Sequence, residues 1–220
     1  NTVTRTLDLP AIDRLALRDG IRLTVRQGTQ AQLTLTGRQE DLDRLDLATT
    51  SGTLALGQLP RPEGKPCLFC IRTPVTATMT LPSLRTAALH GVSRLTVEPG
   101  FSGDFAADVH DAARLDAEGA FAAATFRLQD LGRASVRGTA STTVAEIRGQ
   151  ARLDAQSLRA GMVHVAAGEM GYAIVMPAET LHATSTDFSR IRAYGDPTIR
   201  QVHEAGHGRI EFMEPSATGR

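Results

Sequence analysis

A short alternation of polar and apolar residues recurs along the middle of the chain at a nearly constant interval. Six segments share it: 93–97, 113–117, 132–136, 151–155, 170–174 and 189–193. Their second residues are 20 residues apart at the first step and 19 apart at each later step. Repetition at such a period indicates stacked units, none of which can bury a core alone.

Each repeated segment has the period of a half-buried strand, with apolar positions such as Leu95 and Val97, or Tyr172 and Ile174, directed inward. A second strand precedes each repeat, as in 105–109 and 124–128. A residue that tolerates a left-handed turn lies between them, at Gly91, Asp111, Asp130, Gly149, Gly168 and Asp187. We therefore predict an all-β fold, a parallel β-helix or β-solenoid with coils of about 19–20 residues.

The regular coils are expected over residues 81–195, within a single domain that spans 1–214. Residues 1–80 contain strand-like segments without the strict period, so we expect irregular opening coils and a cap there. Residues 196–214 have two strand-like segments around Gly206 and Gly208, which predicts a closing hairpin. Residues 215–220 are expected to form a loose tail.

Several segments resemble the GIN-domain family, the head domains of putative auto-transporter adhesins. The likeness is carried by Asp19–Gly28, Leu81–Leu84, His90–Leu95 and Ser189–Pro197, and it covers about residues 5–213. The resemblance implies a right-handed parallel β-helix and an exported protein, located in the periplasm, at the cell surface or outside the cell.

Composition excludes several classes of partner. Lys plus Arg equals Asp plus Glu at 24 each, so no net charge draws the chain to nucleic acid. The chain has no Trp, which removes the usual stacking platforms for single-stranded nucleic acid and for sugars. No apolar run reaches the roughly 18 residues of a membrane span. The start at Asn1 is compatible with a mature protein after signal removal, and equally with a trimmed chain.

The strongest candidate for a binding surface is a column of arginines at one position of the repeat. The period places Arg94, Arg114, Arg133, Arg152 and Arg190 above one another on the outer surface, with an interruption at Gly171. Stacked like charges repel, so they need carboxylates or a polyanionic ligand. Asp116 and Asp154 lie two residues further on and face the same side, so a self-compensated, solvated surface is the alternative.

Two further motifs resemble metal or redox sites. Cys67 and Cys70 have the spacing of a redox pair but lack a helix that would lower a thiol pKa, so a disulfide within or between chains is expected. His203-Glu204-Ala205-Gly206-His207 matches the zinc-protease string, but Gly206 and Gly208 disfavour the helix which that chemistry needs. We expect no catalytic residue, no metal and no cofactor.

Some β-helices cleave polysaccharides, so paired carboxylates were considered as well. The candidates are Asp104, Asp108, Asp111, Asp116 and Asp130. Nothing in their spacing singles out two of them as an acid and a base.

Three functions remain open. The first is a non-enzymatic structural or adhesin-like protein of the cell envelope, possibly a subunit of a filament or sheath that associates with itself. The second is a module that binds an anionic surface polysaccharide along the arginine column. The third, a glycan-cleaving enzyme, has the least support from the residues.

Overall fold

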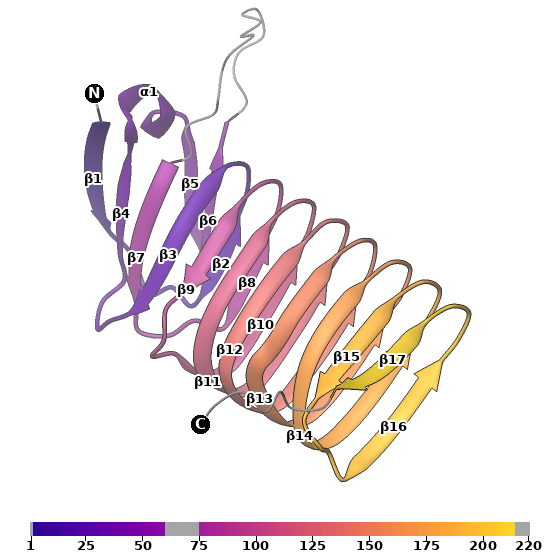
Figure 1. Ribbon diagram of the computed structural model, residues 1–220. Helices are drawn as coiled ribbons and strands as arrows, with labels where there is room; N and C mark the ends of the chain where they lie inside the picture. Colours follow the sequence, from indigo (N-terminus) through magenta and orange to yellow (C-terminus); the bar gives the residue numbers. More distant parts are fainter. Residues whose placement is uncertain (1, 60–74, 214–220) are drawn as a thin grey trace, which may run out of the picture.

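The protein is an elongated solenoid of stacked coils, described by a computed structural model for residues 2–59 and 75–213 (Figure 1). Among these residues, one short helix, α1 (Gln39–Leu42), interrupts a succession of β-strands. The opening strands are β1 (Thr2–Asp8), β2 (Arg14–Leu17), β3 (Ile21–Gln27), β4 (Gln32–Arg38), β5 (Leu45–Thr50), β6 (Thr53–Gln58) and β7 (Val75–Leu81). The coils continue with β8 (Thr86–Leu89), β9 (Arg94–Val97), β10 (Ser102–Val109), β11 (Arg114–Leu128), β12 (Arg133–Ile147), β13 (Arg152–Ala167), β14 (Tyr172–Ser185), β15 (Arg190–Tyr194), β16 (Ile199–Glu204) and β17 (Arg209–Met213). The predicted parallel β-solenoid is confirmed.

The coils form two long walls. The first wall runs through β1, β4, β7, β3 and β9, then through the first halves of β11 to β14, and ends with β15 and β17. The second wall runs through β5, β6, β2, β8 and β10, then through the second halves of β11 to β14, and ends with β16. Every side chain that points outward from a wall therefore stands in a row along the solenoid.

A corner with a left-handed backbone leads from the second wall of one coil to the first wall of the next. Positive φ angles occur in this row at Gly91, Asp111, Asp130, Gly149, Glu169, Asp187 and Gly206. Backbone hydrogen bonds join successive corners, as from the Leu131 N–H to the Asp111 carbonyl at 2.8 Å. The corner carboxylates also contribute, because Asp111 accepts a bond of 2.8 Å from the Gly91 N–H.

In the fifth coil, the predicted strand register is wrong by one residue. The left-handed corner is Glu169, with φ 57°, rather than Gly168. Tyr172 consequently pairs with Arg152 and Arg190, and the buried residues of this strand are Ala173 and Val175. Tyr172 and Ile174, which were predicted to face inward, face outward instead, because a shift of one residue exchanges the two faces of a strand.

The opening region is not a simple run of coils. The coil formed by β2 and β3 lies between β6 and β7 on one side and β8 and β9 on the other, so the order in space differs from the order in sequence (Figure 1). Antiparallel strands complete this end, since β4 pairs with β7 and β1, and β5 pairs with β6. Residues 1–80 thus contribute irregular coils and added antiparallel strands, of which 60–74 lie outside the described ranges.

The predicted closing hairpin at 196–214 is wrong. β16 pairs in parallel with β14, and β17 pairs in parallel with β15. The turn between them is one more left-handed corner, at Gly206, so this segment forms the last coil. Two positions that face the interior in earlier coils carry charges here: Arg200 lies opposite the buried Leu181, and Glu204 lies opposite the buried Ser185. Inward charges of this kind discourage a further strand from adding to the end of a sheet.

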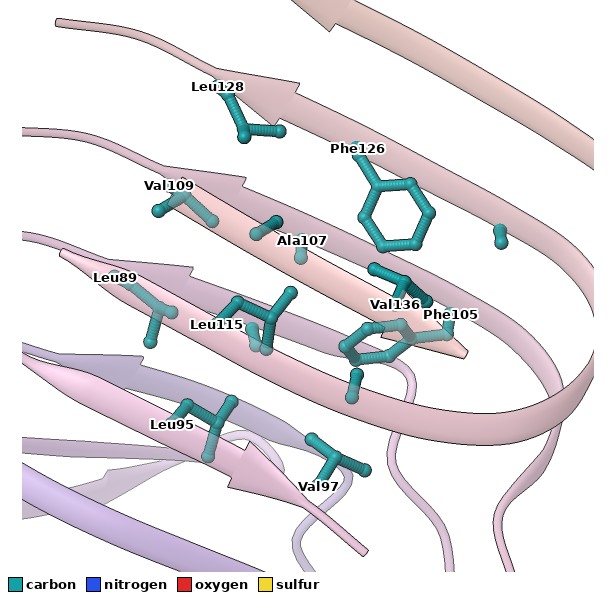
Figure 2. Packing of buried hydrophobic residues seen from close by; sticks show 14 of the residues in the cluster. Leu89, Leu95, Val97, Phe105, Ala107, Val109, Leu115, Phe126, Leu128 and Val136 are labelled. Atoms are coloured by element: carbon teal, nitrogen blue, oxygen red, sulfur yellow. The ribbon is translucent and has the colours of Figure 1, made fainter. Parts of the chain in front are cut away.

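A single hydrophobic cluster runs through the solenoid between the walls (Figure 2). Phe105 packs against Phe121 and Phe126, with ring centroids 5.5 and 6.4 Å apart. Twelve buried leucines lie at or before Leu95 and five lie after it, whereas two buried alanines precede that point and fourteen follow it. The interior is therefore filled by large side chains at the opening end and by small ones in the regular coils.

Candidate functional site

The predicted arginine column exists on the first wall, and its members are in register. Arg94 pairs with Arg114, Arg114 with Arg133, and Arg133 with Arg152. Arg190 follows after one intervening coil, in which Tyr172 occupies the column where Gly171 was predicted. All five predicted arginines are exposed, so the column lies on the surface as expected.

The column is longer than predicted at both ends. Arg22 on β3 pairs with Arg94, and Arg209 on β17 pairs with Arg190. The signal for Arg22 was available, because Arg22–Val25 and Arg94–Val97 have the same sequence, Arg-Leu-Thr-Val. Residue Arg209 was missed because 196–214 was predicted to be a hairpin. We call the set Arg22, Arg94, Arg114, Arg133, Arg152, Arg190 and Arg209 the arginine column.

Tyr172 bridges the gap in the column through its ring. The Arg152 guanidinium carbon lies 4.8 Å from the centroid of the Tyr172 ring, and that of Arg192 lies 5.8 Å away. A guanidinium over an aromatic face is held by the quadrupole of the ring. Tyr172 therefore stabilises two cations at the position where the column lacks one.

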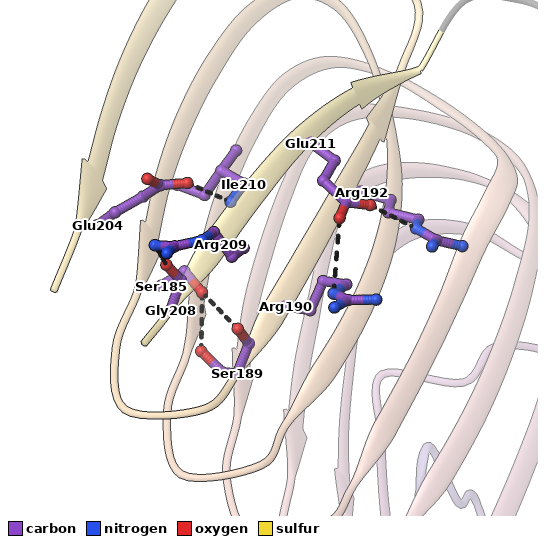
Figure 3. Close-up of polar contacts among 9 residues, drawn as sticks. All are labelled: Ser185, Ser189, Arg190, Arg192, Glu204, Gly208, Arg209, Ile210 and Glu211. Atoms are coloured by element: carbon purple, nitrogen blue, oxygen red, sulfur yellow. Dashed lines mark hydrogen bonds and ion pairs between the residues drawn. The ribbon is translucent and has the colours of Figure 1, made fainter. Parts of the chain in front are cut away.

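A second outward row, two residues further along each strand, carries the nearest carboxylates. Asp116 lies 3.7 Å from Arg94. At the other end, Glu211 contacts both Arg190 at 3.6 Å and Arg192 at 2.8 Å (Figure 3). The hydrogen bond to Glu211 raises the pKa of Arg192 above its ordinary value. Within the column, Arg94 and Arg190 are thus the two arginines with a carboxylate within 4.0 Å among the described residues.

The middle of the column remains positively charged. Arg114, Arg133 and Arg152 have no carboxylate within 4.0 Å among the described residues. Asp154, one of the two carboxylates predicted to neutralise the column, accepts a hydrogen bond from the Gln156 N–H at 3.2 Å. The seven arginines of the column and Arg192 of the second row make eight positive charges on this surface. The same two rows contain three carboxylates, those of Asp116, Asp154 and Glu211. Cations at the spacing of parallel strands, about 4.8 Å, form a linear array that a polyanion can match.

The zinc-protease string does not form a metal site. His203 and Glu204 lie on β16, whereas His207 lies beyond the corner, where its ring stacks on Phe188 with centroids 4.8 Å apart. The Glu204 carboxylate accepts a hydrogen bond from the Ile210 N–H at 2.5 Å (Figure 3). In the described part of the chain, no group of three or more His, Cys, Asp or Glu side chains is placed to hold a metal ion.

The carboxylates considered for glycan cleavage are dispersed. Asp108 faces outward from the second wall, 3.7 Å from Arg127, while Asp116 belongs to the first wall. Asp111 and Asp130 are corner residues with φ 55° and 59°. Asp111 and Asp130 lie at successive corners, where the Asp130 carboxylate accepts a hydrogen bond from the Asp111 N–H at 3.4 Å, so this pair is engaged in the turns. Cys67 and Cys70, the predicted disulfide, lie outside the described residues.

The second wall has a shallow hollow that sequence reasoning did not anticipate. Its lining includes Val144, Glu146, His164, His182 and His203. The rings of His164 and His182 lie tilted against each other, with centroids 4.5 Å apart. The sequence signal for this surface was the alternation Met162-Val163-His164-Val165. In a strand, this alternation places Met162 and His164 on the outward face.

Comparison with known proteins connects this fold to one family. A crystal structure of a putative adhesin from Bacteroides fragilis superposes with a TM-score of 0.87 at 19% identity and covers 97% of each chain. A putative lipid binding protein from Parabacteroides distasonis gives 0.72 at 16% identity and 97% of each chain. A putative adhesin from Parabacteroides merdae gives 0.71 at 14% identity and 96% of each chain. These likenesses establish the fold. The curated proteins gave no match.

The family model extends over most of the solenoid. Within the described residues, no helix is long and apolar enough to cross a membrane. The model described as "Putative auto-transporter adhesin, head GIN domain" matches residues 12–197, which include the arginine column from Arg22 to Arg190. The chain therefore belongs to this GIN-domain family.

Proposed function

We propose that this domain is a non-enzymatic, exported, adhesin-like head that binds an anionic polysaccharide along the arginine column. The observation that carries the proposal is the uncompensated middle of the column, where Arg114, Arg133 and Arg152 stand in register without a carboxylate partner in the described structure. Arginines bind carboxylate and sulfate groups through several parallel N–H donors. The adhesin names of the family and of two structural neighbours support a role in attachment.

A polymeric ligand fits this surface better than a small molecule. The column runs along the outside of a wall and is not enclosed, so no single arginine is desolvated enough to bind one anion tightly. Many weak contacts along one chain add up, because binding at one position brings the neighbouring groups to high local concentration. A rigid row of arginines loses little conformational freedom of the backbone when a polymer binds.

The test compares three arginines of the column with three arginines elsewhere. The triple variant Arg114→Ser, Arg133→Ser and Arg152→Ser removes the uncompensated charges, and the control replaces Arg5, Arg127 and Arg148 by Ser. Both variants lose the same formal charge. Contacts of about 0.5–1 kcal/mol each predict that the first variant binds alginate or heparin roughly 10- to 100-fold more weakly. Titration at two salt concentrations measures this loss.

Two results would contradict the proposal. Equal weakening by both triple variants would mean that net charge, and not the column, determines binding. Binding to vesicles of anionic lipid with no affinity for either polysaccharide would assign the column to a lipid surface instead.

Association with itself is the second candidate function, and the last coil argues against one form of it. Arg200 and Glu204 occupy inward positions of that coil, and the Arg200 guanidinium carbon lies 4.4 Å from the Phe212 ring centroid. Stacking another coil on this end would bury both charges. We therefore expect no filament that grows through the C-terminal coil, and light scattering at rising protein concentration is the measurement.

A further inference from the structure

Three soft donor groups meet on the outer surface of the second wall, on the opposite wall from the arginine column. The Met162 Sδ lies 3.1 Å from the His164 Nε2. The His182 ring lies tilted against the His164 ring, with centroids 4.5 Å apart and an angle of 33° between the ring planes. Met162 is exposed, and both histidines are half-buried.

The solenoid itself produces this arrangement. Met162 and His164 are two residues apart on β13, so they point to the same side of the wall. His182 lies on β14 directly opposite His164, in parallel register. The inward residues between them, Val163 and Leu181, are buried in the core and fix the two strands. The three donors are therefore positioned by backbone that is already ordered.

The nature of these donors selects a class of metal. A thioether is a soft ligand that favours Cu(I), and imidazole also binds copper well. Hard cations such as Mg²⁺ and Ca²⁺ require several oxygen ligands. The nearby Glu146 carboxylate lies 2.7 Å from Arg148, so it is engaged in an ion pair instead of being free for a hard cation.

We propose that Met162, His164 and His182 form a binding site for a soft monovalent metal ion, Cu(I) in particular. The ligands are the thioether sulfur and one imidazole nitrogen from each histidine. The two histidines line the shallow hollow, which leaves room beside them for an exogenous fourth ligand. The site is independent of the arginine column, and it differs from the expectation of no metal drawn from the sequence.

The experiment measures competition for Cu(I) with the chelator bicinchoninate, under a reducing and oxygen-free atmosphere. Cys67 and Cys70 could bind the same ion through thiolates, so the variants are made in a Cys67→Ser, Cys70→Ser chain, with the wild-type chain measured beside it. We expect one Cu(I) per Cys-free chain. Met162→Leu and His182→Gln should each weaken binding by at least about tenfold, since each removes one ligand.

The chain offers a matched control in a second histidine pair. His90 and His110 stack with centroids 4.7 Å apart, in a setting where the neighbouring side chain is the Asp111 carboxylate, 3.9 Å from His90. His110→Gln should leave Cu(I) affinity unchanged if the thioether defines the site. Absence of Cu(I) binding in the Cys-free chain, unchanged affinity in Met162→Leu, or an equal loss in His110→Gln would each overturn the proposal. Circular dichroism of the apo variants separates lost ligation from lost folding.

Discussion

The opening region and the regular coils fill the same interior with different side chains. Up to Leu95 the core is rich in leucine, and beyond it the core is rich in alanine. The opening strands also pair antiparallel in places, whereas β8 to β17 pair only in parallel. In the regular coils, each inward side chain packs against the equivalent side chains of the coils before and after it. The repeat therefore restricts both the position and the size of these side chains.

The two regions should therefore respond differently to substitution. The interior of the regular coils is filled by small side chains, so atoms added there have nowhere to go. Large residues at the opening end leave cavities when they are shortened. The following changes test this difference, beginning with the largest expected effect.

Gly138→Ala should be the most damaging single change in the regular coils. Gly138 has φ 112°, and a Cβ there would lie against the Gly119 carbonyl oxygen of the preceding coil. Backbone strain and overpacking together predict a loss of about 4 kcal/mol or more in the free energy of unfolding. The control is Gly103→Ala, where φ is 91° and no atom lies within 4 Å of the added Cβ. Equal losses in urea unfolding would mean that strain alone matters and that the coils tolerate the extra atom.

Leu23→Ala and Ala155→Leu compare the two kinds of core directly. Both residues are 1% exposed. Shortening Leu23 should cost about 2–5 kcal/mol through a cavity, and enlarging Ala155 about 1–3 kcal/mol through overpacking. Thermal and urea unfolding measure both. A stabilising effect of Ala155→Leu would show that the regular coils contain free space and would remove the proposed difference.

Thr143→Val should stabilise the regular coils. The Thr143 Oγ1 is buried and has no hydrogen-bond partner among the described residues, while Ala124 and Val163 flank it in register. Replacing an unpaired hydroxyl by a methyl group of similar shape should raise the free energy of unfolding by about 1 kcal/mol. Thr143→Ser keeps the hydroxyl and should not reproduce the gain. A loss of stability in Thr143→Val would mean that the hydroxyl is satisfied in solution.

The smallest effect is expected at Asp43, on the surface of the opening region. Hydrogen bonds from Gln39 and then Arg5 hold the pKa of the Asp43 carboxyl below its ordinary value of 3.8. A lowered pKa in the folded state contributes stability above the unfolded pKa, and this contribution is lost as pH falls through the folded pKa. Gln39→Ala should therefore raise the Asp43 pKa toward 3.8 in an NMR titration. An unchanged pKa would assign the shift to Arg5 alone.

Most of the regular coils could be predicted because a solenoid is repetitive in one dimension. The corners and the outward arginines recur at one position per coil, so a period found in the sequence places Arg94, Arg114, Arg133 and Arg152 correctly. The error at Gly168 arose because that coil is one residue longer than the one before it, and Glu169 adopts the left-handed corner. Glycine is the usual residue for a left-handed corner, so the sequence favoured Gly168 over Glu169.

The opening region and the histidine hollow could not be predicted in the same way. The strand β5 was not expected, because its antiparallel pairing with β6 follows no period shared with the coils. The contact between His164 and His182 depends on which residues of β13 and β14 lie opposite each other, and this register contains two irregular steps. A shift of one residue would place either imidazole in the core.

The position of the β2–β3 coil has a consequence for how the chain folds. This coil is made early, yet both of its edges are covered by later segments, β6 and β7 on one side and β8 and β9 on the other. During synthesis one side of this coil stays open until β7 ends at residue 81, and the other side until β9 ends at residue 97. Contacts between distant segments form slowly, and unpaired edges invite other chains to add to them. We therefore expect the opening region to be the slowest part of the solenoid to fold, and the part of the newly made chain that is open longest to unwanted strand addition.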